Sequence, residues 1–273
     1  MHPLVAADQL LSGAIKPLLL DCSFDLADPA AGERSYREGH LPGAHYVHLD
    51  RDLSGAKTGR NGRHPLRERA DYTHWMGQLG IAPGVPVVAY DRQGGMYAAR
   101  AWWVLRWMGH ADVAVLDGGL AAWQQAGGTL TQALPSAAQQ APYPSLPPAV
   151  PTLDARQLQA RLGEVRVIDA RAPGRYRGEV EPLDAVAGHI PGALNRFFKD
   201  NLQADGRFKP AELLRAEFAP LLDARPVVHQ CGSGVTACHN ILAMELAGLG
   251  VTALYPGSWS EWSSDPTRPM TRA

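Results

Sequence analysis

The sequence predicts an α/β protein made of two tandem copies of one domain, each with a mainly parallel sheet flanked by helices. Three observations predict this class. Five sequence blocks recur in the same order in the two halves of the chain, short apolar runs bounded by turn residues alternate with helical patterns within each copy, and a segment rich in Pro, Ala, Gln and Ser separates the copies. We place the domains at residues 1–130 and 151–273 and the linker at 131–150.

The repeated blocks justify the expected elements in chain order. The amphipathic helical pattern of residues 5–13 returns at 153–163, and the strand-like apolar run within 17–25 returns within 165–173. The later pairs are GHLPGA at 39–44 with GHIPGA at 188–193, a strand-then-helix block at 86–109 with one at 226–248, and a strand-like block at 113–123 with one at 251–262. One such match could arise by chance, but five in one order indicate a duplicated domain.

The composition is that of a soluble globular protein, and it excludes several classes of function. The 273 residues are 45% hydrophobic and 19% charged, the formal net charge is −1, and no run of Lys and Arg offers a surface for nucleic acid. We find neither a signal-peptide pattern nor an apolar run near the ~18 residues that span a bilayer, so we expect no membrane partner. Three cysteines, Cys22, Cys231 and Cys238, form no disulfide or zinc pattern. We therefore expect no metal ion and a cytoplasmic location.

One cysteine lies where a parallel α/β sheet places its ligands. Cys231, in the stretch HQCGSGVTACHN (229–240), follows a β-branched apolar run and precedes a helical pattern, so we expect it at the carboxyl end of a strand. A cysteine there is either a reactive thiolate or a small hydrophobic residue at a tight bend. Aligning the copies sets Asp91 opposite Cys231, and a buried apolar position does not readily accept a carboxylate. We therefore interpret Cys231 as a reactive thiol and the first domain as non-catalytic.

The residues after this cysteine are suited to binding an anion. Gly232 and Gly234 allow the backbone to turn its N–H groups inward as a nest, and a helix that begins near Val235 adds the N–H groups of its first turn. Ser233 and Thr236 can donate further hydrogen bonds, although Thr236 can equally cap the helix. Together these groups are expected to stabilise an anionic sulfur on the cysteine.

A cysteine in an anion-binding loop fits two kinds of chemistry. A phosphatase needs an arginine that closes the loop after five intervening residues, and this chain has Ala237 there. In sulfur transfer, the thiolate takes a sulfane sulfur, becomes a persulfide and passes the outer sulfur to a nucleophile, and the loop needs no arginine of its own. The residues favour sulfur transfer, and a non-catalytic sulfur carrier or interaction module is a more distant alternative.

These features resemble the two-domain rhodanese family of sulfurtransferases over nearly the whole chain. The resemblance rests on the tandem copies, the GHLPGA and GHIPGA blocks, Asp91 in the first loop and the second loop CGSGVTA (231–237), which is similar to the form typical of 3-mercaptopyruvate sulfurtransferases. Thiosulfate sulfurtransferases more often carry a basic residue inside this loop. The resemblance implies two rhodanese-like domains packed face to face, with a catalytic second domain and an active site in the cleft between the two.

The resemblance also implies roles for individual residues. It makes Cys231 the persulfide-forming nucleophile, residues 232–236 its cradle, and Arg175 a ligand of the substrate carboxylate. A second arginine of the family, usually found after a Glu-Pro pair, is replaced here by Leu183, and Arg177 is a candidate to compensate. Without the resemblance, both arginines would be interpreted as parts of a solvated, charged loop.

Two residues of the first domain have alternative interpretations. Asp91 is either a minor part of the active site or a strand-end residue that caps the next helix. His40 lies in the GHLPGA turn, where it either anchors a loop or relays protons to the active site from across the domain interface.

The expected reaction is a sulfur transfer in two steps. Cys231 takes the sulfur of 3-mercaptopyruvate and releases pyruvate, and the persulfide then passes the sulfur to cyanide, a thiol or a thioredoxin-like protein. No metal or organic cofactor is needed, because the covalent persulfide carries the sulfur. Thiosulfate remains an alternative donor, which would make the protein a thiosulfate:cyanide sulfurtransferase.

Overall fold

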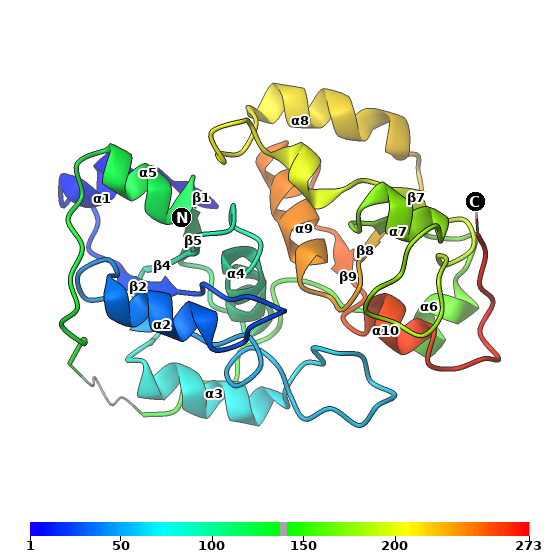
Figure 1. Ribbon diagram of the computed structural model, residues 1–273, viewed down its shortest axis with the longest axis horizontal. Helices are drawn as coiled ribbons and strands as arrows, with labels where there is room; N and C mark the ends of the chain where they lie inside the picture. The colour runs from blue at the N-terminus through cyan, green and yellow to red at the C-terminus, as the bar shows by residue number, and fades with distance from the viewer. Residues whose placement is uncertain (137–140, 273) are drawn as a thin grey trace. The chain divides into compact units, whose positions relative to one another are not determined.

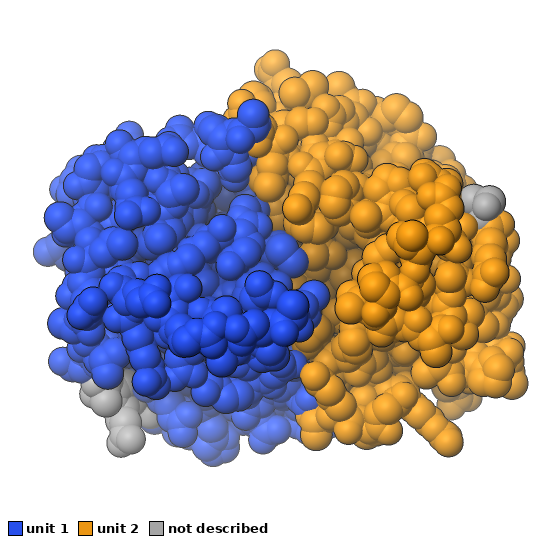
Figure 2. Space-filling model, viewed as in Figure 1, with its two compact units in different colours: residues 1–55, 67–149, 204–208 blue, residues 56–66, 150–203, 209–273 orange. Residues whose placement is uncertain are grey.

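The computed structural model describes residues 1–136 and 141–272, and the chain divides into two compact units (Figure 2). Unit 1 comprises Met1–Gly55, Arg67–Ala149 and Ala204–Phe208, and unit 2 comprises Ala56–Leu66, Val150–Gln203 and Lys209–Ala273. Residues 137–140 of the predicted linker lie outside the described residues.

Unit 1 is built on a parallel sheet whose strands, within the described residues, lie in the order β1-β5-β4-β2-β3. They are β1 (Leu4–Val5), β2 (Leu18–Asp21), β3 (His45–Tyr46), β4 (Val87–Tyr90) and β5 (Val113–Leu116). All residues of β4 and β5 are buried, as is usual for parallel strands that are covered on both faces. This double burial explains why both strands read as continuous apolar runs in the sequence.

Helices connect the strands of unit 1. They are α1 (Ala7–Leu11), α2 (Ala31–Glu38), α3 (Arg69–Gln78), α4 (Ala98–Trp107) and α5 (Gly119–Gln125). Helix α4 packs against β4 and β5 (Figure 1), and its Trp102 and Trp103 are fully buried. The loop between β4 and α4 therefore starts at the carboxyl end of a buried strand and ends at a buried helix.

Unit 2 repeats this architecture with a parallel sheet in the order β7-β6-β8-β9 among the described residues. The strands are β6 (Arg166–Asp169), β7 (Leu194–Asn195), β8 (Val227–Gln230) and β9 (Ala253–Leu254). The helices are α6 (Ala155–Ala160), α7 (Pro173–Arg177), α8 (Ala211–Phe218), α9 (Thr236–Leu246) and α10 (Ser258–Trp262), with 3-10 turns η1 (Phe198–Asn201) and η2 (Ala219–Leu221). Helix α9 packs against β8 and β9 (Figure 1). The predicted fold class is confirmed.

The histidines of the two GH-x-PGA blocks show how closely the copies correspond. The ring of His40 stacks on Tyr36 with centroids 3.9 Å apart, and the ring of His189 stacks on Tyr176 at 4.0 Å. Nδ1 of each histidine lies within hydrogen-bond distance of the carbonyl oxygen of its tyrosine, at 2.7 Å and 2.8 Å. The backbone of each histidine also forms an antiparallel bridge with the segment after the last helix of its unit. Both histidines thus anchor that segment.

Two segments pack with the unit that is formed mainly by the other half of the chain. Residues 56–66 follow β3 in the sequence but belong to unit 2, where the N–H of Arg63 donates a hydrogen bond to Oγ of Ser260 at 3.0 Å. Residues 204–208 belong to unit 1, where the N–H of Phe208 donates to Oδ1 of Asp117 at 2.9 Å. The units therefore depart from the sequence boundaries at these two segments.

Candidate active site

Cys231 lies directly after β8 and begins the loop that leads into α9. It is only 2% exposed. Its backbone N–H donates a hydrogen bond to Oγ of Ser258 at 3.1 Å, and its carbonyl oxygen accepts one from the N–H of Trp259 at 3.0 Å. The sulfur has no hydrogen-bond partner among the described residues. The backbone of Cys231 is therefore fixed, whereas its thiol is left for chemistry.

Two glycines make the loop after Cys231 possible. Gly234 has a φ of +76°, and a Cβ on it would lie 2.3 Å from the carbonyl oxygen of Pro256, so no other residue fits there without strain. A Cβ on Gly232 would lie 2.8 Å from Nη2 of Arg63 and 3.3 Å from Nη1 of Arg175. Gly232 therefore leaves room for two guanidinium groups next to the backbone of the residue after Cys231.

The corresponding loop of unit 1 shows what a loop of this kind binds. Asp91 follows β4 and is 1% exposed. Its Oδ1 accepts hydrogen bonds from the N–H groups of Gln93 and Gly95, both at 2.8 Å, and its Oδ2 accepts from Tyr97 and Ala98 at 2.9 Å and 3.0 Å. Four backbone N–H groups thus converge on one carboxylate. The unit 1 loop is filled by its own anion, and Asp91 at the same time caps the start of α4.

A histidine from residues 56–66 reaches the loop that follows Cys231. Nδ1 of His64 lies 2.7 Å from Oγ of Ser233, two residues after Cys231, and both side chains belong to buried residues. The hydrogen bond fixes the serine hydroxyl inside the loop. It also gives the site an imidazole that can hold or return a proton through that hydroxyl.

Arg175 is held at the site by a row of alternating charges. Its Nε lies 3.2 Å from both carboxylate oxygens of Glu181, and its Nη2 lies 2.7 Å from Oε1 of Glu181 and 3.3 Å from Oδ2 of Asp184. We call the whole series the charge row; in order along it, the members are Asp169, Arg171, Glu181, Arg175, Asp184 and Arg63. Since every link is a charge-assisted hydrogen bond or ion pair between largely buried side chains, the row fixes the orientation of its arginines.

Other predicted site residues lie in different surroundings. Arg177 is exposed and pairs with Glu179, its Nε 2.6 Å from Oε1, so it takes no part in the charge row. His40 is buried in unit 1, where its Nε2 lies 3.2 Å from the carbonyl oxygen of Ala133, and its other ring nitrogen also faces a backbone carbonyl. These contacts account for His40 as an anchor of the loop.

The start of α9 is left without a side-chain cap. Val235 occupies the N-cap position and offers no hydrogen-bonding side chain. Thr236, the first helical residue, is half-buried, and its hydroxyl has no hydrogen-bond partner among the described residues. The unpaired N–H groups of the first turn and this hydroxyl are thus available to an anion at the loop.

Arg63 and His64 were not predicted from the sequence as residues of the site. They lie in the segment KTGRNGRHPLRER (57–69), which has no counterpart among the five repeated blocks. One sequence feature could have indicated them. This segment contains arginines and a histidine, lies between two predicted elements and is not accounted for by the duplicated domain. Without spatial contacts, nothing in the sequence indicates that this stretch packs in unit 2.

The other two cysteines are engaged in packing. Sγ of Cys238 donates to the carbonyl oxygen of Gly234 at 3.3 Å, and Sγ of Cys22 donates to that of Leu20 at 3.8 Å. Within residues 1–136 and 141–272, no group of three or more His, Cys, Asp or Glu side chains is arranged to hold a metal ion. No helix in this described part of the chain has both the length and the apolar character required to cross a membrane.

Known proteins are similar to this chain over both units. The rhodanese-like domain family matches residues 6–126 and 154–265. A protein of Pseudomonas aeruginosa named "Probable 3-mercaptopyruvate sulfurtransferase" is 50% identical over 276 residues, which cover 98% of this chain and 97% of the relative. The thiosulfate sulfurtransferase of Mus musculus is 35% identical over 94% of this chain and 89% of its own length. Among solved structures, 3-mercaptopyruvate sulfurtransferase from Leishmania major aligns with a TM-score of 0.85 and 30% identity over 95% of this chain and 74% of that chain.

Proposed function

We propose a reaction for this protein from the premise that the chain belongs to the rhodanese family, whose domain it carries twice. It is a sulfurtransferase that moves a sulfur atom from a small donor to a small acceptor. The proposed donor is 3-mercaptopyruvate, and the sulfur passes through a persulfide on Cys231 with release of pyruvate. The observation that carries the proposal is the place of Cys231, whose unpartnered thiol opens a loop that lies against the guanidinium of Arg175.

In the first half-reaction, one sulfur atom moves from a carbon atom of the donor to the sulfur of Cys231. The thiolate of Cys231 attacks the donor sulfur, an S–S bond forms as the C–S bond breaks, and the electron pair stays with the leaving enolate of pyruvate. This enolate takes up one proton and becomes pyruvate. The N–H groups of the loop and of the first turn of α9 stabilise the negative charge on the sulfur, as the unit 1 loop stabilises the carboxylate of Asp91.

Ser233 and His64 are suited to stabilising and protonating the leaving enolate. Its negative charge gathers on the former ketone oxygen, where a preorganised hydroxyl donor gives the most stabilisation. The hydroxyl of Ser233 is held by His64 at 2.7 Å, so its direction is set before the donor binds. In our proposal Ser233 donates to this oxygen, and His64 supplies the proton that the hydroxyl passes on.

The second half-reaction returns the cysteine to its starting state. Cyanide or a thiol attacks the outer sulfur of the persulfide, and the Cys231 thiolate leaves. A thioredoxin-like protein is a thiol acceptor of suitable chemistry. No metal or organic cofactor enters this scheme, because the persulfide itself carries the sulfur. A reducing compartment such as the cytoplasm would keep the three free cysteines as thiols.

Thiosulfate is the second candidate donor. Two guanidinium groups beside Gly232 suit a dianion as well as a carboxylate, and a relative that is 35% identical is named thiosulfate sulfurtransferase. The loop interior from Gly232 to Val235 has no basic residue of its own, and for this reason we place 3-mercaptopyruvate first.

Steady-state kinetics with both donors test the proposal. We expect the wild type to release pyruvate from 3-mercaptopyruvate with a higher kcat/KM than it forms thiocyanate from thiosulfate and cyanide. Cys231→Ser should lose both activities, whereas the control Cys238→Ala should keep them because the sulfur of Cys238 is buried and donates to the backbone carbonyl oxygen of Gly234. A preference for thiosulfate would change the donor, and activity in Cys231→Ser would exclude Cys231 as the nucleophile.

A further inference from the structure

Arg63 places a second guanidinium beside the nucleophile. It comes from residues 56–66 and belongs to unit 2 together with Arg175 and the Cys231 loop. Nη2 of Arg63 and Nη1 of Arg175 lie 2.8 Å and 3.3 Å from the position that a Cβ on Gly232 would occupy. Because Gly232 follows Cys231 directly, both cations lie against the start of the loop that follows Cys231.

The hydrogen bonds of both arginines leave these two nitrogens unused. Arg63 uses Nη1 for Asp184 and for the carbonyl oxygen of Leu183, and Arg175 uses Nε and Nη2 for Glu181 and Asp184. Nη2 of Arg63 and Nη1 of Arg175 have no hydrogen-bond partner among the described residues. Nε of Arg63 is buried and also has no partner. A buried donor such as this Nε is costly to leave unpaired, and the two Nη groups can donate to an acceptor that a ligand brings.

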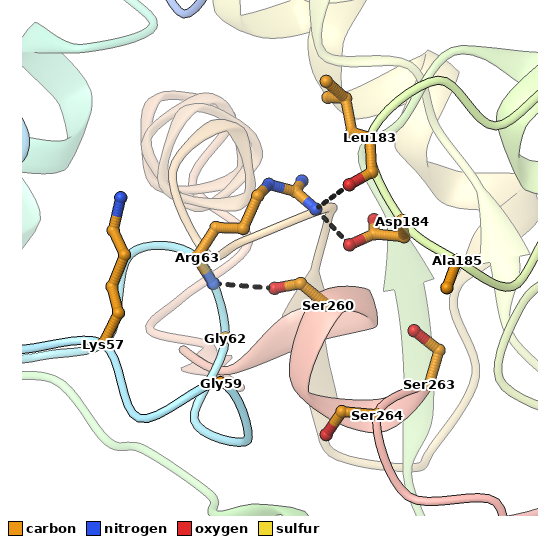
Figure 3. Close-up of a pocket in the computed structure, with 10 residues that line it drawn as sticks. All are labelled: Lys57, Gly59, Gly62, Arg63, Leu183, Asp184, Ala185, Ser260, Ser263 and Ser264. Carbon is orange, nitrogen blue, oxygen red and sulfur yellow. Dashed lines mark hydrogen bonds and ion pairs between the residues drawn. The ribbon is translucent and has the colours of Figure 1, made fainter.

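A small hollow lies at Arg63. It has a volume of about 290 Å³ and is lined by residues of unit 2, among them Arg63, Asp184 and Ser260 (Figure 3). The N–H of Ser260 donates to the carbonyl oxygen of Gly232 at 2.9 Å, which connects the wall of the hollow to the nucleophile loop. The hollow therefore lies beside the loop of Cys231, although neither Cys231 nor Arg175 is among the described residues that line it.

Leu183 stands at the position where the family usually has a second arginine. Its side chain is 45% exposed and brings no charge to the site. Figure 3 shows the Arg63 side chain reaching from the opposite wall to the backbone of Leu183 and to Asp184. Arg63 thus ends the charge row with one carboxylate neighbour, whereas Arg175 lies between two.

We propose that Arg63 and Arg175 together bind the carboxylate of the sulfur donor, and that Arg63 supplies the second guanidinium of this carboxylate site. The inference rests on the proposed function, because it concerns how the same site recognises 3-mercaptopyruvate. Nη2 of Arg63 and Nη1 of Arg175 each donate to a carboxylate oxygen, and the donor sulfur is thereby held at Cys231. The salt bridge with Asp184 positions the guanidinium for this contact.

A comparison of two sulfur donors distinguishes a role of Arg63 in binding the donor carboxylate from a purely structural role. One is 3-mercaptopyruvate, followed by pyruvate release, and the other is inorganic polysulfide, which loads Cys231 without any carboxylate and is followed by thiocyanate formation with cyanide. For Arg63→Leu we expect a loss of about 10- to 100-fold in kcat/KM for 3-mercaptopyruvate, mainly through KM, as for the loss of hydrogen bonds to a charged group. Polysulfide turnover should stay near the wild-type rate.

Matched variants complete the test. Arg63→Lys keeps the charge but lacks the planar fork, so we expect an intermediate KM. Arg60→Leu removes an exposed arginine of the same segment and should behave as the wild type with both donors. An equal loss with both donors in Arg63→Leu, or no loss with either, would overturn the inference.

The experiment gives one result if the proposed function is wrong and a different result if only the role of Arg63 is wrong. If the wild type released no pyruvate from 3-mercaptopyruvate, the proposed function and the carboxylate site would both be wrong. If the wild type turned this donor over and Arg63→Leu had the same KM, only the role of Arg63 would be wrong.

Discussion

At the scale of single residues, the three cysteines differ in what surrounds their sulfur atoms. The thiols of Cys22 and Cys238 donate to backbone carbonyl oxygens, and burial followed by the nearby charge of Asp21 raises the pKa of Cys22 well above its usual value. The thiol of Cys231 has no such partner within the described residues. The sequence separates Cys231 from the others because only this cysteine stands between a strand-like run and a Gly-Ser-Gly turn. It carries no sign of the contacts that occupy the other two.

Ser258 is a residue whose importance the sequence does not reveal. It has a φ of 53°, a left-handed conformation that is unfavourable for residues other than glycine. Its Oγ accepts the hydrogen bond from the N–H of Cys231 and donates to the carbonyl oxygen of Tyr255 at 3.0 Å. These two bonds offset the backbone strain and fix the backbone of Cys231.

We predict that Ser258→Ala lowers the free energy of unfolding by about 1–3 kcal/mol, because it removes both hydrogen bonds and keeps the strain. Ser258→Gly should be about 1 kcal/mol more stable than Ser258→Ala, because glycine adopts a positive φ without this cost. Urea unfolding of the three proteins measures both differences. An alanine variant as stable as the glycine variant would show that the backbone of Ser258 is not strained.

At the scale of elements, β8 and α9 correspond to β4 and α4, and the residue after the strand is Cys231 in unit 2 and Asp91 in unit 1. The long buried strands and their helices were predicted from the sequence because their apolar runs recur in both copies. Strands such as β3 and β7 were not, because two residues carry no periodicity and such strands are formed only by pairing with a neighbour. The start of α9 was predicted, but the free hydroxyl of Thr236 could be recognised only in the structure.

The stability of the folded protein in acid depends on a histidine of β8. His229 is fully buried in this strand, its Nδ1 has no hydrogen-bond partner among the described residues, and burial lowers its pKa to about 3. Because the same side chain has a pKa near 6.5 when the chain is unfolded, protonation favours the unfolded state. The stability that the neutral ring provides is therefore complete above about pH 6.5 and is lost as the pH falls toward about 3.

We predict that His229→Leu, which removes this titration, makes unfolding less sensitive to acid. Between pH 6.5 and 4 the free energy of unfolding of the wild type should fall more steeply than that of the variant, with a difference in slope of up to about 1.4 kcal/mol per pH unit. Urea unfolding across this pH range checks the slopes. Parallel curves for the two proteins would mean that His229 is not held neutral in the folded state.

At the scale of the whole chain, the proposed active site depends on contacts between distant parts of the sequence. His64 and Ser233 are 169 residues apart, and Arg63 and Asp184 are 121 apart, yet each pair forms a direct polar contact. Local patterns predict Cys231 and its glycines, because their motif is contiguous, and the resemblance to the family implies Arg175. They do not predict Arg63 or His64, because no periodicity or turn chemistry links residues 56–66 to unit 2.

A double-mutant cycle tests this long-range contact. We expect His64→Ala and Ser233→Ala each to lower kcat for 3-mercaptopyruvate by about 10- to 1000-fold, because each removes part of one proton-donating unit. The double variant should lose little more than either single variant, since the two residues act through one hydrogen bond. Losses that multiply would show that His64 and Ser233 act independently.

The central claim is that sulfur is carried covalently on Cys231, and intact-mass spectrometry tests it most directly. The protein is incubated with 3-mercaptopyruvate without an acceptor, its mass is measured, and cyanide is then added. The account predicts that the wild type gains one sulfur atom, that peptide mapping places it on Cys231, and that cyanide removes it as thiocyanate, while Cys231→Ser gains nothing. A wild type that releases pyruvate without gaining sulfur, or that carries the sulfur on Cys22 or Cys238, would contradict the account.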